Sequence, residues 1–190
     1  MARAFFHDPA AQLILPQEPS RLKALKWMMR TAIGYGLRYG TVSVTDQSDG
    51  AAIWLPPSQS HFSFSQAMHT GMLGAPLRFG CGALLRLVRM ANWLEAPHKR
   101  IASQPHWYLL LLAVDPDRQS QGLGRNLIQP GLSRADAEGL PCYLETFNEH
   151  SVLFYEKHGF CMKYQGQLPS GPTFWSLLRP GEQADGSAGR

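Results

Sequence analysis

Long apolar runs are missing from this sequence. The longest uninterrupted run, Trp107–Val114, has eight residues, whereas a membrane-spanning helix needs roughly 18 or more. The opening residues 1–6 are followed at once by His7-Asp8-Pro9, so the apolar stretch of a secretory signal does not develop. The sequence therefore predicts a soluble, cytoplasmic protein without a membrane partner.

Cysteines are also few. The chain has three, Cys81, Cys142 and Cys161, which are odd in number and widely spaced. This pattern suits reduced thiols in a cytosol better than a disulfide framework or a metal cluster. We expect all three to be packing residues and expect no metal site.

Basic residues are not concentrated in any stripe. The net charge of +4 is compatible with an anionic ligand, but the 18 lysines and arginines are spread along the chain. The densest group, Arg21, Lys23, Lys26 and Arg30, has the spacing of one solvated helix face. The sequence therefore predicts no nucleic-acid partner.

The first half of the chain predicts a helix, a hairpin and a helical insertion. The 190 residues, 44% of them hydrophobic, are enough for one domain with a core. Ser20 can cap a helix that Gly34 and Gly36 end, and 41–46 and 51–55 have the composition of an antiparallel hairpin. In the segment 58–105 we expect two helices, one opened by the capping-box spacing at Ser63 and one over about 78–94. Side chains of this insertion that could line an acceptor pocket are Phe62, Phe64, Met68, Met72, Phe79 and Trp93.

The second half predicts a buried strand that leads into a helix and a second strand. Two strands that are joined by a helix and lie side by side in one sheet run parallel to each other. We therefore predict a single α/β (α+β) domain over 1–180, with a mixed, mostly antiparallel sheet, a central parallel pair of strands and helices on both faces. The elements are a strand at 107–114, a helix at about 122–138 kinked at Pro130-Gly131, a strand at 142–146, a short helix from Asn148 to His158-Gly159, strands at 162–168 and 173–178, and a flexible tail at 181–190.

A glycine-containing loop lies between the buried strand and the helix. Glycines let the backbone approach an anion closely, and the first N–H groups of the helix point toward it. Arg118 and Arg125 could add charge-assisted hydrogen bonds. We expect this loop to bind a pyrophosphate. Its residues are Gln119, Ser120, Gln121, Gly122, Leu123, Gly124 and Arg125.

Two other phosphate-binding motifs do not fit this loop. A P-loop needs Lys and then Ser or Thr after its second glycine, whereas Gly124 is followed by Arg125-Asn126. A dinucleotide fingerprint needs Gly or Ala where Leu127 stands. The loop therefore disfavours a Walker-type ATPase and NAD binding.

Three stretches together resemble the GNAT superfamily of acyl-CoA-dependent N-acyltransferases. They are Leu112-Ala113-Val114-Asp115-Pro116, the Gln-x-x-Gly-x-Gly pattern over 119–124, and Asn148 to Tyr155-Glu156-Lys157-His158-Gly159-Phe160. Two further stretches, Trp54-Leu55-Pro56-Pro57 and His106-Trp107-Tyr108-Leu109, are similar to a bacterial branch that includes puromycin acetyltransferase-like proteins. Members of the superfamily usually begin with a strand and a helix, whereas residues 1–8 resemble only the end of that helix, so the first strand is expected to be missing.

The resemblance implies a cosubstrate and roles for particular residues. It implies acetyl-CoA as the donor, with the pantetheine arm bound to the backbone of Leu112, Ala113 and Val114. It also implies that Asn148 binds CoA and that Tyr155 donates a hydrogen bond to the departing sulfur. Both would lie on one face of a helix that begins at Asn148, since they are seven residues apart.

The general base stays open at this point. Some relatives carry a catalytic glutamate where Tyr143 stands, and Glu145 is two residues later, on the same face of the predicted strand. Glu145 could take the proton of the amine or bind its ammonium group; a water chain or His106 are the alternatives.

The sequence thus predicts an N-acetyltransferase that acts by direct attack of a neutral amine on the thioester. The acceptor, a small molecule or a peptide, is not identified, and neither is the oligomeric state. The alternative from another class is a CoA-binding regulatory module with little or no turnover, which the missing strand and the displaced carboxylate favour.

Overall fold

The computed structural model describes residues 1–60, 66 and 74–181. The helix start predicted at Ser63, four of the six pocket side chains (Phe62, Phe64, Met68 and Met72) and nearly all of the predicted tail lie outside the described residues. Of the helices that are described, none is long and apolar enough to cross a membrane.

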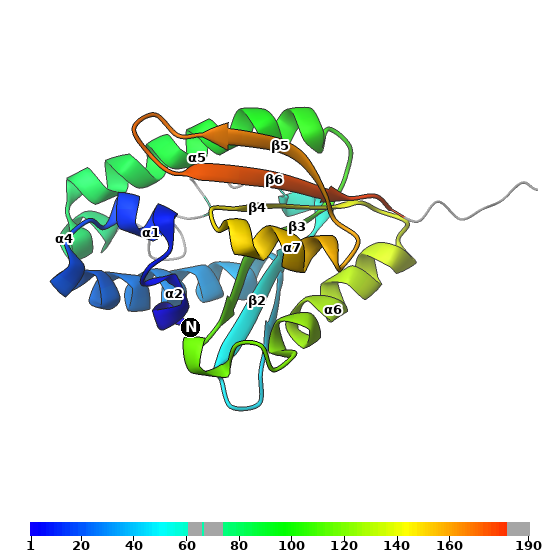
Figure 1. Cartoon of the computed structure of the whole chain (residues 1–190), viewed down its shortest axis with the longest axis horizontal. Helices are drawn as coiled ribbons and strands as arrows, with labels where there is room; N and C mark the ends of the chain where they lie inside the picture. The colour runs from blue at the N-terminus through cyan, green and yellow to red at the C-terminus, as the bar shows by residue number, and fades with distance from the viewer. Residues whose placement is uncertain (61–65, 67–73, 182–190) are drawn as a thin grey trace, which may run out of the picture.

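A six-stranded mixed sheet forms the centre of the molecule (Figure 1). The strand order is β1-β2-β3-β4-β6-β5, and every neighbouring pair is antiparallel except β3 and β4. The predicted fold class, with its central parallel pair, is therefore confirmed. The strands are β1 (Thr41–Val44), β2 (Gly50–Leu55), β3 (Trp107–Val114), β4 (Cys142–Thr146), β5 (Cys161–Gln167) and β6 (Thr173–Arg179).

Helices cover both faces of the sheet. On one face, α6 (Leu123–Ala137) and α7 (Glu149–Glu156) enclose the largest core cluster, which includes Trp54 and Leu109. On the other face, α2 (Glu18–Tyr39) packs on β2, and α5 (Cys81–Ile101) brings His98 against the tyrosines of β3 and β4. The short elements are η1 (Ala2–Phe5), α1 (Pro9–Ile14), η2 (Pro57–Gln59), α4 (Ala75–Phe79) and η4 (Pro116–Arg118).

The prediction that Gly34 and Gly36 end the first long helix is wrong. Helix α2 continues through both glycines and ends at Gly40. A Cβ atom on Gly36 would lie 2.6 Å from the Ile53 side chain, so the glycine is needed for close packing of helix on strand and not for termination.

Helix α6 also runs without interruption through Pro130. At the next residue, a Cβ atom on Gly131 would lie 2.3 Å from the Trp54 indole. The Pro-Gly pair thus occurs where the helix comes closest to β2, and the glycine makes that approach sterically possible.

A β-bulge in β3 changes which side chains face which core. Ile53 pairs with Leu111 while Trp54 pairs with Leu109, so Leu110 has no partner in β2. As a consequence, Leu110 and Leu111 both pack toward α2, and the alternation of β3 is shifted by one residue beyond the bulge.

The predicted packing role is wrong for two of the three cysteines. Cys142 is buried, but Cys81 and Cys161 are exposed. They occupy the first residues of α5 and β5, where the chain enters each element from a loop. The two described pocket candidates of the insertion also differ in surroundings: Phe79 packs on Trp27, and Trp93 is 53% exposed.

Candidate active site

Strands β3 and β4 are paired only where they begin. Their parallel register comprises Trp107 with Cys142 and Tyr108 with Tyr143, although β3 continues to Val114 and β4 to Thr146. The two strands therefore separate toward their C-terminal ends. An extended group inserted between them could bind the backbone of β3 as another strand would.

A cavity of about 550 Å³ opens beside these strand ends. It is formed by the N-terminal segment, the loop after β3, the loop after β4 and the start of β6. Open α/β sheets typically bind ligands at the carboxyl ends of their strands. The lining residues used below are Arg3, Gln119, Phe147, Asn148, Glu149 and Trp175.

The predicted phosphate loop leads directly into α6. Gly122 is the N-cap residue with φ +80°, and Ser120 also has a positive φ of +62°. No side chain caps the helix, so its first N–H groups are left for an anion or water. Gly124 has ordinary helical geometry, but a Cβ atom there would lie 3.3 Å from the Phe154 ring of α7.

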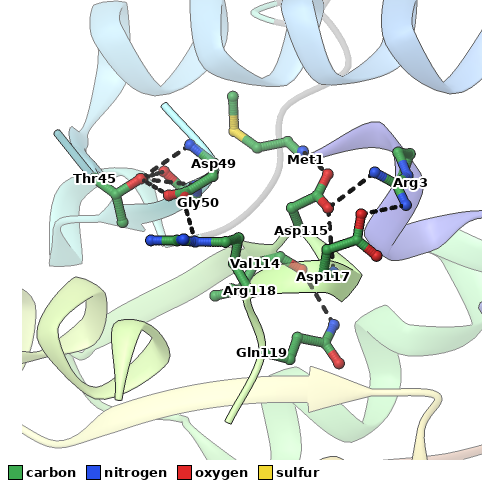
Figure 2. Close-up of polar contacts among 10 residues, drawn as sticks. All are labelled: Met1, Arg3, Thr45, Asp49, Gly50, Val114, Asp115, Asp117, Arg118 and Gln119. Carbon is green, nitrogen blue, oxygen red and sulfur yellow. Dashed lines mark hydrogen bonds and ion pairs between the residues drawn. The ribbon is translucent and has the colours of Figure 1, made fainter. Parts of the chain in front are cut away.

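Gln119 connects this loop to the splayed strand. Its side-chain amide donates a hydrogen bond to the Val114 carbonyl at 3.1 Å (Figure 2). The Val114 carbonyl, the last of β3, thus already accepts one hydrogen bond from a residue of the loop.

Arg118 is already engaged by another part of the fold. Its Nε lies 3.0 Å from Asp49 Oδ2, in the turn between β1 and β2. The Thr45 hydroxyl lowers the pKa of Asp49, and the positive charge of Arg118 adds to this shift. Arg118 therefore ties the loop to the β1–β2 turn, whereas Arg125 is exposed in the first turn of α6.

The N-terminal segment lies against the same loop (Figure 2). Arg3 contacts Asp115 at 3.2 Å and Asp117 at 2.9 Å, and the terminal ammonium of Met1 lies 3.9 Å from Asp115. Since Arg3 and Asp117 are largely exposed, these ion pairs contribute little stability. Their effect is to place residues 1–9 at the rim of the cavity.

Asn148 and Tyr155 are both carried by α7. Asn148 is the N-cap residue, and its side chain accepts a hydrogen bond from the His150 N–H at 3.0 Å, so the predicted helix start is confirmed. Tyr155 is buried and packs on Phe154 and Phe160. Burial raises the pKa of Tyr155 above its usual value, which keeps its hydroxyl protonated at neutral pH.

Glu145 lies on the opposite face of the sheet, under α5. Its side chain is 4% exposed, and Oε1 is 3.7 Å from Nδ1 of His98. Burial raises the pKa of Glu145 to about 7, and the charge of Glu95 acts in the same direction; the nearby hydroxyls of Tyr108 and Tyr143 act in the opposite direction. Such a carboxyl exchanges protons near neutral pH.

Several polar atoms around Glu145 make no hydrogen bond of ordinary geometry within the described part of the chain, although the Tyr143 hydroxyl lies near enough to lower the pKa of Glu145. They are Glu145 Oε2, the Tyr143 hydroxyl and the Ser176 hydroxyl. Glu145 and Ser176 are direct partners in the β4–β6 register. Buried polar groups are normally hydrogen-bonded, so this cluster has capacity for a donor such as an ammonium group or a water molecule.

His98 could not be found by reasoning from the sequence. It lies on α5, 47 positions before Glu145 in the numbering, and stacks on Tyr143 with ring centroids 4.2 Å apart. No local motif marks it, because only the packing of α5 on the sheet brings it to β4. His106, considered as a base, is buried beside His98 and is separated by it from Glu145.

Comparison with known proteins finds a curated relative that matches most of this chain. An N-acetyltransferase of Schizosaccharomyces pombe, described as uncharacterised, is 26% identical over 163 residues, which cover 83% of this chain and 66% of that protein. The chain thus spans only part of that relative's length.

Solved structures show the same fold. A Corynebacterium glutamicum protein described as "histone acetyltransferase HPA2 and related acetyltransferase" has a TM-score of 0.62 and 20% identity over 97% of this chain and 88% of its own. A polyamine N-acetyltransferase of Drosophila melanogaster has a TM-score of 0.57 and 13% identity over 94% and 90%.

The family assignment rests on the sequence itself. Residues 56–160 match the acetyltransferase (GNAT) family, a range that includes the splayed strands, the loop before α6 and all of α7. More than half of the chain is therefore accounted for by one family pattern, and this protein belongs to the GNAT acetyltransferase family.

Proposed function

We propose that the protein transfers an acetyl group from acetyl-CoA to an amine acceptor by direct nucleophilic attack. The observation that carries the proposal is the separation of β3 from β4 beyond Tyr108, with a glycine N-cap at the following helix. We also propose a cytoplasmic location and a small-molecule or peptide acceptor. The resemblance of residues 54–57 and 106–109 supports the puromycin acetyltransferase-like branch as the subgroup.

The residues present fit a CoA molecule. The left-handed Gly122 and the uncapped start of α6 suit a pyrophosphate, with Gln119 to Arg125 around it. The backbone of Leu112, Ala113 and Val114 would bind the extended pantetheine arm, and Asn148 lies on the cavity wall. When bound, acetyl-CoA supplies the activated thioester.

Two side chains are proposed to act in the reaction, one as a general base and one as a hydrogen-bond donor. Glu145 takes a proton from the acceptor ammonium, since an amine with a pKa near 10.4 is almost fully protonated at neutral pH. Tyr155 keeps its proton and donates a hydrogen bond toward the sulfur as negative charge develops there. Proton removal and sulfur stabilisation are thereby assigned to opposite faces of the sheet, with the splayed strands between them.

A covalent route through the buried cysteine is disfavoured. Burial raises the pKa of Cys142 to about 12, so its thiol is almost entirely protonated at neutral pH. Because the thiolate is the nucleophilic form, Cys142 does not supply an acetyl-enzyme intermediate.

The direct test follows thiol release from acetyl-CoA with a panel of amines. The panel contains agmatine, spermidine, a histone-tail lysine peptide and a peptide with a free N-terminus, chosen partly from the activities named for the two structural neighbours. Thiol release with at least one amine is expected, with mass spectrometry showing the acetylated product. Tight CoA binding without turnover on the whole panel would instead favour a regulatory CoA-binding module.

The second test concerns the phosphate loop. Replacing Gly122 with valine is expected to weaken CoA binding about tenfold or more, because a left-handed backbone costs a non-glycine residue roughly 1–2 kcal/mol and a β-branched side chain restricts it further. Gln121→Ala is the matched control with a smaller expected loss. Calorimetry gives both dissociation constants, and an unchanged affinity in Gly122→Val would argue against this loop as the binding site.

A further inference from the structure

A chain of three buried ionisable groups runs from β4 to the start of β3. Glu145 Oε1 lies 3.7 Å from His98 Nδ1, and His98 Nε2 lies 2.8 Å from His106 Nε2. His106 Nδ1 in turn lies 2.7 Å from the carbonyl oxygen of Gln104. The side chains of Glu145 and His98 are 4% and 5% exposed, and residue His106 is 1% exposed.

The contact between His106 Nδ1 and the Gln104 carbonyl determines which ring nitrogens carry hydrogen in the neutral imidazoles. A carbonyl oxygen only accepts, so Nδ1 of His106 must carry its hydrogen and Nε2 of neutral His106 must hold a lone pair. Nε2 of His98 then donates to it. The Nδ1 lone pair of neutral His98 consequently faces the carboxyl group of Glu145.

In this orientation the ionised form of Glu145 is disfavoured beside a neutral His98. If the carboxyl is ionised while His98 is neutral, a lone pair faces a negative charge. One added proton removes this conflict, either on Glu145, which then donates to Nδ1, or on His98, which then pairs with the carboxylate. A movement of about half an ångström brings the 3.7 Å contact to hydrogen-bond distance.

We infer that Glu145 and His98 hold one proton between them and act as a single acid–base unit, in which His106 orients His98. The proton-sharing stands on this geometry alone; its use in removing the acceptor's proton rests on the proposed function. His98 is a positioning residue that acts through Glu145.

In this step the acceptor ammonium loses one proton to Glu145. An N–H bond of the acceptor ammonium breaks, an O–H bond forms on Glu145, and the nitrogen keeps the electron pair with which it attacks. The new proton is then shared with Nδ1 of His98, so the unit changes from a charge of −1 to 0. The buried site ends the step without net charge, which low polarity favours.

Other groups around the unit do not replace His98 in this role. The charged or titratable neighbours of Glu145 among the described residues are Glu95 on α5, Tyr108 on β3 and Tyr143 on β4. Burial raises the pKa values of both tyrosines above their usual range, so they stay protonated. Glu95 pairs with Lys99 at 2.9 Å, and its negative charge raises the pKa of Glu145 instead of supplying a second proton acceptor beside it.

The first experiment does not depend on activity. In protein labelled with ¹⁵N-histidine, the Nδ1 resonance of His98 is expected to move with a midpoint near that of Glu145, about 7. In Glu145→Gln this transition should vanish, whereas in Glu156→Gln, which removes an exposed carboxylate of α7, it should remain. The same His98 titration in wild type and Glu145→Gln would overturn the inference, and the wild-type titration is informative even if a variant does not fold.

The second experiment uses an amine that the panel has shown to be a substrate. In His98→Gln, which keeps a polar group toward His106 but loses Nδ1, kcat should fall at least about tenfold. The rising limb of kcat against pH should also move to lower pH, because loss of one of two proton sites lowers the affinity of the unit for a proton. The affinity for acetyl-CoA should not change.

The outcomes separate the two proposals. A coupled His98 titration in a protein that acetylates no amine would leave the proton-sharing intact and contradict the proposed function. A lower kcat with an unshifted pH profile in His98→Gln would reduce His98 to a packing residue, even in an active acetyltransferase.

Discussion

Replacing Tyr155 with phenylalanine is expected to lower kcat of acetyl transfer roughly 10- to 1000-fold, with less than about a threefold change in acetyl-CoA affinity. The change removes one hydroxyl and keeps the ring that packs on Phe154 and Phe160. A hydrogen bond to a charged group contributes about 1.5–3 kcal/mol, and a lost catalytic donor can cost about 4. Since the hydroxyl acts chiefly when charge develops on sulfur, ground-state binding should be nearly unaffected.

Steady-state kinetics and calorimetry measure the two quantities separately. Tyr164→Phe is a matched control, because it deletes the same atom from a half-buried tyrosine of β5 outside the proposed site. Normal turnover of Tyr155→Phe would return Tyr155 to a packing role and require another donor for the sulfur.

The largest expected effect on stability comes from adding a single methyl group at Gly131. A Cβ atom there would lie 2.3 Å from the Trp54 indole, and Trp54 is 1% exposed in the main core. Neither α6 nor β2 can yield without disturbing the neighbouring core contacts, since interiors are close-packed. Gly131→Ala is therefore expected to lower the free energy of unfolding by about 2–3 kcal/mol or more.

Gly34 offers the control, because it also lies within a long helix but is exposed and has no atom within 4 Å of an added Cβ. Gly34→Ala should raise the free energy of unfolding by about 0.5–1 kcal/mol through helix propensity alone. Urea denaturation measures both variants. A Gly131→Ala protein as stable as wild type would show that the helix and strand can separate at this point.

The proposed cofactor site could largely be predicted from the sequence because its determinants are local. The apolar stretch ending at Val114, the glycine at position 122 and the Asn148 cap are short-range features that correctly locate β3 and the starts of α6 and α7. Backbone sterics and helix-end chemistry act over a few residues. Residues that are neighbours in the sequence therefore suffice to predict these features. The order strand, helix, strand further required the parallel pair that the sheet contains.

Nothing in the sequence marks glycines whose role is tertiary. Gly36 and Gly131 both lie inside helices, and each makes room for a side chain from β2. From the sequence, Gly36 indicated the end of a helix, whereas α2 continues to Tyr39. The role of both glycines is to allow the approach of a distant strand, which local sequence does not specify.

The proposed proton-handling side of the site was decided by tertiary structure alone. Glu145 could be singled out from its strand, but its partner His98 comes from α5, and His106 completes the chain only because α5 lies across β3 and β4. Burial and geometry, rather than residue type, give Glu145 a pKa of about 7. The sequence by itself therefore determined where β3, β4, α6 and α7 lie along the chain and placed the glycine-containing loop between β3 and α6, since these features depend on local backbone preferences. Only the packing of helix on sheet decided which buried groups meet, because contacts between residues far apart in the chain set the desolvation of Glu145 and its proposed proton-sharing with His98.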